Sequence, residues 1–229
     1  MIVAIDGPAG SGKSSISLQL ALKYGFVYLD SGAMYRSVTL ACLKNGVDVY
    51  NEAEVTRVAK ESQIEFLYDQ DGKQTVLLNG EDVTGDIRSS AVNAVVSVVS
   101  AHPSVRTALL DAQRAYGQKT SVVAEGRDTA TTVFPNADLK IFLDASPETR
   151  ALRRIEQNKQ KGMLDDPDAL DFEKVLESIR KRDEIDSSRA ASPLKPAEDS
   201  IIIDTSPLTF DEVFSLISRY IDAFLVQQN

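Results

Sequence analysis

Residues 7–14 read Gly-Pro-Ala-Gly-Ser-Gly-Lys-Ser, which fits the pattern Gly-x4-Gly-Lys-Ser/Thr. A glycine-rich turn lets backbone N–H groups curl around an anion, and the amino end of a following helix adds about half a positive charge. In this pattern the lysine contacts the β- and γ-phosphates and the last hydroxyl contacts Mg²⁺. The stretch therefore predicts a phosphate-binding P-loop for a nucleoside triphosphate, with Lys13 on the phosphates and Ser14 as metal ligand.

The flanking residues supply the strand and the helix that this loop needs. Residues 2–5 form a short apolar, β-branched run. From Lys13 onward, Ile16, Leu20 and Ala21 recur at helical spacing until Gly25 ends the pattern. The sequence therefore places the loop at the end of a strand and at the start of a helix.

Four further apolar runs alternate with helical patterns and predict the rest of a sheet. The first ends in Asp30 and Ser31, at least one of which we expect to cap the next helix. These runs are residues 26–29, 121–124, 139–143 and 201–203. Short apolar strands that alternate with helices are typical of a parallel sheet covered on both faces. We therefore predict a three-layer α/β/α fold with a five-stranded parallel sheet.

Residues 63–84 show a different period, with apolar and polar residues alternating along residues 63–68 and a second run at 73–78. The breaks at 69–72 and 79–80 are hairpin signals, and residues 81–84 supply a third strand. Antiparallel strands do not belong inside a parallel sheet, so we place residues 46–101 as a small insertion.

The remaining segments complete the predicted organisation of one unit, residues 1–229. A helix is expected over 103–116 with Gly117 beyond it, and Thr209 is expected to cap a carboxyl-terminal helix. The apolar side chains of that helix are expected to face the core; they are Val213, Leu216, Ile217, Tyr220 and Phe224. Gly162 and Pro167 interrupt a highly charged stretch, and residues 156–170 therefore predict a mobile, solvated lid. The core comprises residues 1–45, 102–155 and 171–229.

Composition excludes several classes of protein. Hydrophobic residues make up 43% of 229 residues, and no apolar run approaches the roughly 18 to 20 residues of a membrane span. The net charge of −9 argues against a nucleic-acid polymer or an acidic membrane as partner. One cysteine, Cys42, and one histidine, His102, support neither a Cys/His metal cluster nor a Ser/His/Asp triad. We expect a cytoplasmic protein and a monomer.

Three classes of P-loop protein compete. A GTP switch would carry Asn-Lys-x-Asp, but the nearest string, at 158–161, ends in lysine. A motor ATPase usually follows its strand-end aspartate with glutamate, whereas Asp144 is followed by Ala145. A small-molecule kinase needs arginines on several elements, because phosphoryl transfer depends on positioning and charge neutralisation. Such arginines are present at positions 36, 127, 150, 153, 154, 180, 182 and 189.

Further blocks of the chain resemble, in order, the signature sequences of bacterial cytidylate kinases. These are Asp30-Ser31-Gly32-Ala33-Met34-Tyr35-Arg36, Glu125-Gly126-Arg127-Asp128, Val133-Phe134-Pro135, and Arg182-Asp183 with Asp186 and Arg189. The resemblance covers nearly the whole chain. It implies a transferase of pyrimidine nucleotide metabolism, which passes the γ-phosphoryl group of ATP to CMP, and usually dCMP, with Mg²⁺. It also implies a nucleoside monophosphate kinase fold with a CMP-binding insertion. The predicted antiparallel strands, within residues 46–101, match this insertion.

The resemblance also implies roles for individual residues. ATP would be bound by Gly7, Pro8, Ala9, Gly10, Ser11, Gly12, Lys13, Ser14 and Ser15. The CMP phosphate would be held by Arg36 and Arg127, and cytosine would be surrounded by Ser31, Ser97, Arg106 and Asp128. The ribose and base side would be lined by Arg182, Asp186 and Arg189. The predicted catalytic residues are Lys13, Arg127, Arg154 and Arg182, of which Arg154 is added for its place before the lid.

Some residues depart from the pattern or allow other interpretations. Ala130 stands where the family commonly has glycine, so the loop after Asp128 is expected to follow a slightly different path. Solvated helix charges or i,i+4 partners are the expectation for Arg153, Arg180 and Lys181, and Asp183 could pair with an arginine. Two alternative functions stay open: another P-loop kinase, acting on UMP or a non-nucleotide, or a non-catalytic ATP-binding module.

Overall fold

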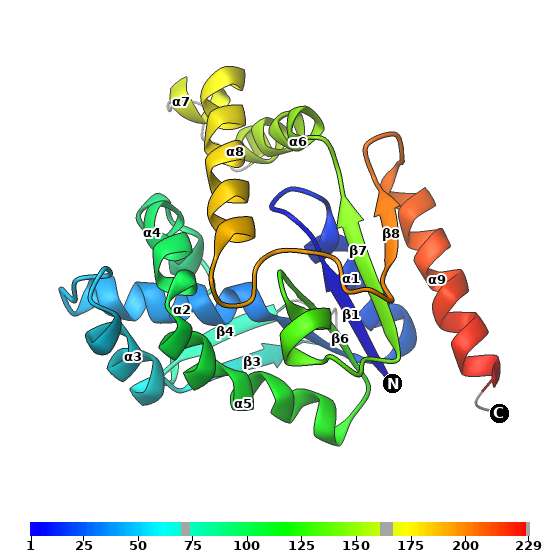
Figure 1. Ribbon diagram of the computed structural model, residues 1–229, viewed down its shortest axis with the longest axis horizontal. Coiled ribbons are helices and arrows are strands. Elements are labelled where there is room, and N and C mark those ends of the chain that lie inside the picture. The colour runs from blue at the N-terminus through cyan, green and yellow to red at the C-terminus, as the bar shows by residue number, and fades with distance from the viewer. Residues whose placement is uncertain (70–73, 161–166, 228–229) are drawn as a thin grey trace.

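The computed structural model describes residues 1–69, 74–160 and 167–227. Its main sheet has five parallel strands in the order β2-β6-β1-β7-β8. Figure 1 labels four of them, β6, β1, β7 and β8. The strands are β1 (Ile2–Asp6), β2 (Val27–Asp30), β6 (Val122–Gly126), β7 (Leu139–Asp144) and β8 (Ile201–Asp204). Ile5 pairs with Glu125 on one side and Ile141 on the other. The loop after β1 therefore leaves the centre of the sheet, between two neighbouring strand ends.

Helices join the strands, and α2 and α9 begin at the caps expected from the sequence. They are α1 (Lys13–Tyr24), α2 (Ser31–Lys44), α3 (Glu52–Glu61), α4 (Ser90–Ala101), α5 (Pro103–Lys119), α6 (Pro147–Gln160), α7 (Pro167–Leu170), α8 (Phe172–Ser188) and α9 (Phe210–Gln227), with a 3₁₀ turn η1 (Asp86–Arg88) and a π-helical turn η2 (Thr129–Val133). Asp30 caps α2 by accepting from Ala33 N at 2.9 Å. The Thr209 hydroxyl accepts from Glu212 N at 3.3 Å and caps α9.

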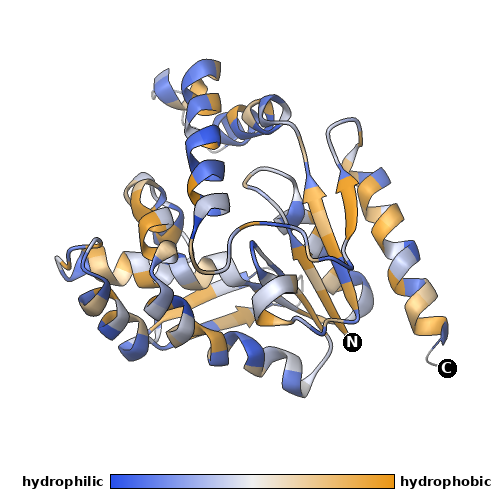
Figure 2. Cartoon of the chain, in the orientation of Figure 1, coloured by the Kyte–Doolittle hydropathy of each residue, from blue (hydrophilic) through white to orange (hydrophobic). Residues whose placement is uncertain are grey.

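Side chains that alternate along the central strands enter two different apolar clusters. Val122 and Ala124 of β6 pack on one face with Met34 and Val38 of α2. Val123 points to the other face, where α1 and α9 cover the sheet. Each fully buried aliphatic side chain contributes about 1.5–3 kcal/mol of transfer free energy. Figure 2 shows the strands as hydrophobic and α7 and α8 as mainly hydrophilic. The predicted three-layer architecture is therefore confirmed.

The predicted antiparallel unit is also confirmed, with β3 (Ile64–Tyr68), β4 (Gln74–Leu78) and β5 (Glu81–Asp82) in one sheet. Phe66 pairs with Val76, and both side chains belong to the same apolar cluster as Met34 of α2. The insertion therefore shares its core with the main fold. Residues 70–73 of the predicted turn lie outside the described residues, and the domain limits 1–45, 46–101, 102–155 and 171–229 stay predictions.

The segment predicted as a lid contains helix at both ends. Helix α6 continues to Gln160, and α7 occupies Pro167–Leu170. Gly162, Asp165 and Asp166 lie outside the described residues. The mobility of residues 156–170 stays a prediction.

Two expectations about helices were wrong. Gly117 does not end the preceding helix, because α5 continues to Lys119. A Cβ atom at Gly117 would lie 2.8 Å from Phe134 Cε1, so glycine allows close packing there. Tyr220 does not point inward: it is 37% exposed, whereas Ile221 is fully buried. The buried stripe of α9 follows Val213, Ile217 and Ile221, and Tyr220 lies beside it. Within the described ranges, none of the helices has the length and apolar character needed to cross a membrane.

Candidate active site

A cleft with a cavity of about 360 Å³ lies at the carboxyl ends of the parallel strands, where open α/β sheets bind ligands. The loop after β1 lines one part of the cleft, and residues of α2, η1, α4, α5, the end of β6, α6 and α8 line the rest. Most residues predicted for the site line this cleft: Ala9, Gly10, Gly12, Lys13, Ser14, Ser15, Ser31, Arg36, Arg106, Arg127, Asp128, Arg154, Arg182, Asp186 and Arg189.

Four predicted residues are not part of the lining. Gly7 packs against β7, where an added Cβ would lie 2.1 Å from the Leu143 carbonyl oxygen. Pro8 contributes its carbonyl to Lys13, and Ser11 is buried. Ser97 accepts a hydrogen bond through its carbonyl from the Ser100 hydroxyl at 3.2 Å, and Ser100 lines the cleft in its place. Gly7, Pro8 and Ser11 therefore shape the loop from behind.

Lys13 is the cation at the loop end of the cleft. It is 5% exposed, and its Nζ donates to the Pro8 carbonyl at 2.8 Å. Burial lowers its pKa to about 7, and the positive charge of Arg127 acts in the same direction, while Glu125 opposes both. A buried ammonium with a lowered pKa is stabilised by an anion beside it. Lys13 is thus suited to hold a phosphate.

Glu125 is a site residue to which the sequence had assigned no role. The Tyr28 hydroxyl donates to its carboxylate at 2.7 Å, and the Ser31 hydroxyl donates to its carbonyl at 2.7 Å. Burial and the nearby Asp30 raise its pKa, whereas Lys13 and a hydrogen bond with the Ser14 side chain lower it. Its position at the end of β6, beside the loop, was the available signal.

Several arginines, whose positive charges are only partly neutralised by acidic side chains, meet in the middle of the cleft. Burial lowers the pKa of Arg182 to about 9 and that of Arg36 to about 10, and the other cations of the cluster add to both effects. Burial and Arg127 also lower the pKa of Arg154. Arg182 Nε has no hydrogen-bond partner among the described residues. Buried, mutually repelling guanidinium groups favour an anionic ligand.

Asp186 is the acid that balances part of this charge. It accepts from Arg127 Nε at 2.9 Å and lies 4.0 Å from Arg189 Nη1. Burial favours its neutral form, but Arg127, Arg182 and Arg189 keep its pKa below the usual value. Arg189 Nη2 is buried without a partner in the described part of the chain. Asp186 therefore orients two arginines of the cleft.

The far end of the cleft holds a buried ion pair between Arg106 and Asp128. Arg106 is 8% exposed and Asp128 is 5% exposed. Arg106 Nη1 also donates to the Ser100 carbonyl at 2.9 Å, and its guanidinium carbon lies 5.1 Å from the centre of the Tyr35 ring. The end of the cleft thus presents a carboxylate, guanidinium N–H groups and an aromatic ring side by side.

Asp6, at the end of β1, holds the turn that follows Asp128. Its carboxylate accepts from Thr129 N at 2.8 Å and from Ala130 N at 2.7 Å. Burial raises its pKa to about 6, against the effect of these hydrogen bonds. Ala130 is buried and does not have a positive φ, so the turn accommodates alanine where glycine was expected. Asp6 therefore fixes the backbone that carries Asp128.

The secondary arginine predictions had mixed outcomes. Arg153 is not a solvated helix charge, because it donates to Thr205 Oγ1 at 3.0 Å and to the Thr205 carbonyl at 2.6 Å. Arg180 is exposed and pairs with Glu148 across two helices rather than at i,i+4. Asp183 pairs with an arginine as expected, namely Arg150. Lys181 is exposed.

Arg88 is a further residue of the cleft that the sequence did not single out. It is exposed on η1 and lies 3.5 Å from Asp30. It comes from the insertion, and only the folded chain brings it beside α2.

Comparison with known proteins agrees with this geometry. The family model described as "Cytidylate kinase" matches residues 3–223. A cytidylate kinase of Bacillus licheniformis is 44% identical over 97% of this chain and 96% of that relative. One from Anoxybacillus flavithermus is 47% identical over 94% and 93%. An uncharacterized protein from Eubacterium ventriosum has a similar fold, with a TM-score of 0.52 at 14% identity over 97% and 98%.

Both the family model and the relatives cover nearly the whole chain, including every element that lines the cleft. The chain therefore belongs to the cytidylate kinase family of (d)CMP kinase enzymes.

Proposed function

We propose that this enzyme transfers the γ-phosphoryl group of ATP to CMP or dCMP by in-line displacement, giving ADP and CDP or dCDP. The observation that carries the proposal is one cleft with a P-loop lysine at one end and the buried pair Arg106–Asp128 at the other. The arginines between them lie where two substrates would bring their phosphates together.

The pair Arg106–Asp128 has the chemistry to select cytosine. Cytosine offers an amino donor at N4 and an acceptor at N3, and uracil reverses both. The Asp128 carboxylate can accept from the amine, and Arg106 can donate to the acceptors. Because both side chains are buried, uracil would leave the Asp128 carboxylate without its amine donor and would present an N–H group to Arg106 where an acceptor is needed. Such a mismatch costs about 10⁴-fold in discrimination. Ser31 and Ser100 line the same cleft and add hydroxyl groups beside the base.

The transfer step needs charge neutralisation more than proton abstraction. The attacking group is a phosphate whose second pKa is about 6, so it is largely ionised at neutral pH. The one histidine, His102, lies at the start of α5 with its ring nitrogen 2.8 Å from the Val49 carbonyl, outside the cleft lining. Lys13, Arg127, Arg154 and Arg182 would stabilise the transferring group, and Arg36 and Arg127 would hold the acceptor phosphate.

The residues at the loop end also fit Mg²⁺. No group of three or more His, Cys, Asp or Glu side chains that could hold a metal occurs in the described ranges. Mg²⁺ at kinase sites is usually bound by substrate phosphates, water and one or two carboxylates. The Ser14 hydroxyl and the buried Glu125 carboxylate fit this donor set. When bound, the ion would neutralise charge on the β- and γ-phosphates.

A substrate panel tests the proposal. ADP release from ATP would be measured with CMP, dCMP, UMP, AMP and dTMP as acceptors, with and without Mg²⁺. We expect turnover with the two cytosine nucleotides to exceed that with the others by at least about 10²-fold, and to require Mg²⁺. Equal rates with all five acceptors would refute the cytosine assignment, and binding of ATP without any transfer would indicate a non-catalytic module. Cytoplasmic location and the monomeric state stay predictions.

A further inference from the structure

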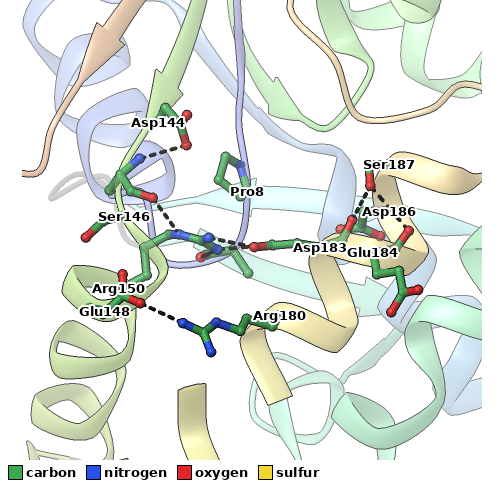
Figure 3. A network of polar contacts seen from close by, with 12 residues as sticks. Pro8, Asp144, Ser146, Glu148, Arg150, Arg180, Asp183, Glu184, Asp186 and Ser187 are labelled. Carbon is green, nitrogen blue, oxygen red and sulfur yellow. Dashed lines mark hydrogen bonds and ion pairs between the residues drawn. The ribbon is translucent and has the colours of Figure 1, made fainter. Parts of the chain in front are cut away.

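Arg150 is a buried cation outside the cleft lining that contacts three parts of the fold. It lies on α6 and is 3% exposed. Its Nε donates to the Ala145 carbonyl at 2.9 Å, and its Nη1 donates to the Ala9 carbonyl at 3.2 Å. Its Nη1 and Nη2 also donate to the two carboxylate oxygens of Asp183 at 3.0 and 2.5 Å. Figure 3 shows the guanidinium reaching from α6 towards Asp183 on α8.

On the donor side, Arg150 supports the apex of the P-loop. Ala9 and Gly10 line the cleft, and a Cβ atom added at Gly10 would lie 3.2 Å from Arg150 Cβ. The loop therefore packs directly on this side chain. The hydrogen bond to the Ala9 carbonyl fixes one peptide of the loop, because a buried carbonyl without a partner is costly.

On the acceptor side, Asp183 fixes the rotation of α8. It follows Arg182 and precedes Asp186 by three residues, and both of these neighbours line the cleft. One turn of helix separates Asp183 from Asp186, so anchoring Asp183 also sets where Arg182 and Asp186 point. The Asp183 carboxylate, itself outside the lining, is bound at both oxygens by Arg150.

The other contacts between α6 and α8 do not reach the P-loop. An apolar cluster joins the two helices through Ala151, Val175, Leu176 and Ile179. The pair Arg180–Glu148 also joins them (Figure 3), but its side chains are 60% and 51% exposed. Such an exposed pair adds little stability, whereas a buried bidentate pair fixes geometry. Within the described contacts of α6 and α8, Arg150 alone bonds to both the P-loop and α8.

We propose that Arg150 and Asp183 are positioning residues that hold the P-loop and α8 in one register, so that the donor and acceptor phosphates meet in line. The inference rests on the proposed phosphoryl transfer and deepens it. Neither side chain lines the cleft, so the pair acts on the rate of transfer through the peptides and arginines it positions. A misplacement of about 1 Å is enough to slow such a step about 10²-fold.

The test is Asp183→Asn, which retains one carbonyl oxygen and the size of the side chain but removes the charge and the second acceptor. Glu148→Gln is the matched control, because it breaks the exposed pair between the same two helices. The dissociation constants of a non-hydrolysable ATP analogue and of CMP would be measured separately by calorimetry, and the transfer rate by single turnover. We expect the rate to fall about tenfold or more while each constant changes less than about threefold.

A second variant, Arg150→Lys, keeps a positive charge but cannot reach all three acceptors, and should give the same split between rate and affinity. A wild-type rate in Asp183→Asn, even with a lower melting temperature, would show that the pair is only structural and overturn the inference. An equal loss in Glu148→Gln would do the same. If the wild-type enzyme prefers an acceptor other than CMP, the proposed specificity fails, and the same comparison with that acceptor decides the positioning role.

Discussion

The two ends of the cleft are built in different ways. The donor end is one continuous segment, residues 7–14, which offers mainly backbone groups and one buried lysine. The acceptor end is assembled from side chains of α2, α5, the turn after β6 and α8, which are far apart in the sequence. A triphosphate can be recognised by backbone N–H groups because it needs positive dipoles and no base reading. A particular nucleobase requires side chains of defined chemistry at defined places.

Charge is also handled differently at the two ends. Lys13 is buried with a lowered pKa and a carbonyl partner, Pro8. At the acceptor end each buried acid meets an arginine, in Arg106–Asp128 and Arg127–Asp186. Such pairs add little net stability, because desolvation offsets their attraction, but they fix orientation. The donor end thus needs a bound phosphate to neutralise the charge of Lys13, whereas the paired side chains at the acceptor end are already held in place by each other.

The sharpest test of the donor end is Lys13→Ala. Removing the buried cation should lower kcat about 10³-fold, because a preorganised charge beside the transferring group is lost. The rate would be measured with both substrates saturating. Lys23→Ala, which removes an exposed lysine of the same helix, is the control and should leave kcat within about twofold. A loss below tenfold in Lys13→Ala would refute the role of this side chain in transfer.

The dependence of the donor end on its backbone is tested by comparing Gly7→Ala with Gly12→Ala. At Gly7 the new Cβ would lie 2.1 Å from the Leu143 carbonyl, so we expect the free energy of unfolding to fall by about 3 kcal/mol or more. Gly12 has a φ of +93° but open space around it, so the cost there should be about 1–2 kcal/mol. Urea denaturation measures both. Equal losses would show that steric contact with β7 is unimportant.

The acceptor end is tested by Asp128→Asn, which places an amide donor where the carboxylate accepts. We expect kcat/KM for CMP to fall about 10²-fold, while the affinity for ATP changes less than about twofold. Asn is preferred to Ala because its amide oxygen can still accept from Arg106, whereas Ala would leave this buried guanidinium without its side-chain partner and would also destabilise the fold. Asp111→Asn, on the exposed side of the helix that carries Arg106, is the control. Equal losses for CMP and ATP would exclude Asp128 from base reading.

The strand, loop and helix of the donor end were predicted from the sequence because they depend on neighbouring residues, while the contacts of residues 7–14 with ATP stay a prediction. Residues 7–14 carry both the conformation and the chemistry in one pattern, and the flanking strand and helix follow from hydrophobic period. The five-stranded sheet was predicted for the same reason, since buried parallel strands are short apolar runs. Gly117 and Tyr220 were misjudged because close packing against Phe134 and the position of Ile221 depend on tertiary contacts.

The acceptor end could be predicted only through resemblance, and incompletely. Glu125, which lies beside the P-loop, was missed for a related reason: it was within a recognised block, but its role depends on Ser14, Tyr28 and Lys13, which lie on other elements. Arg88 looked like one charge among many in the insertion until the fold placed it beside Asp30. On α4 the structure places Ser100, and not Ser97, in the cleft lining, and the predicted contact of Ser97 with cytosine stays a prediction. Such differences arise because the sequence alone does not show how one helix or strand is aligned against the next.

The smallest predicted effect concerns pH at the donor end. Burial lowers the pKa of Lys13 to about 7, and a bound triphosphate should raise it again by favouring the charged form. Below pH 7 the lysine is already charged, so ATP binds without proton uptake at this site. Above pH 7 the lysine must gain a proton on binding, so the dissociation constant of ATP should rise up to about tenfold per pH unit.

Calorimetry in two buffers with different ionisation enthalpies measures how many protons the enzyme takes up when ATP binds. Lys13→Arg stays charged throughout and should abolish the slope. A constant affinity between pH 6.5 and 8.5 in the wild-type enzyme would contradict the lowered pKa.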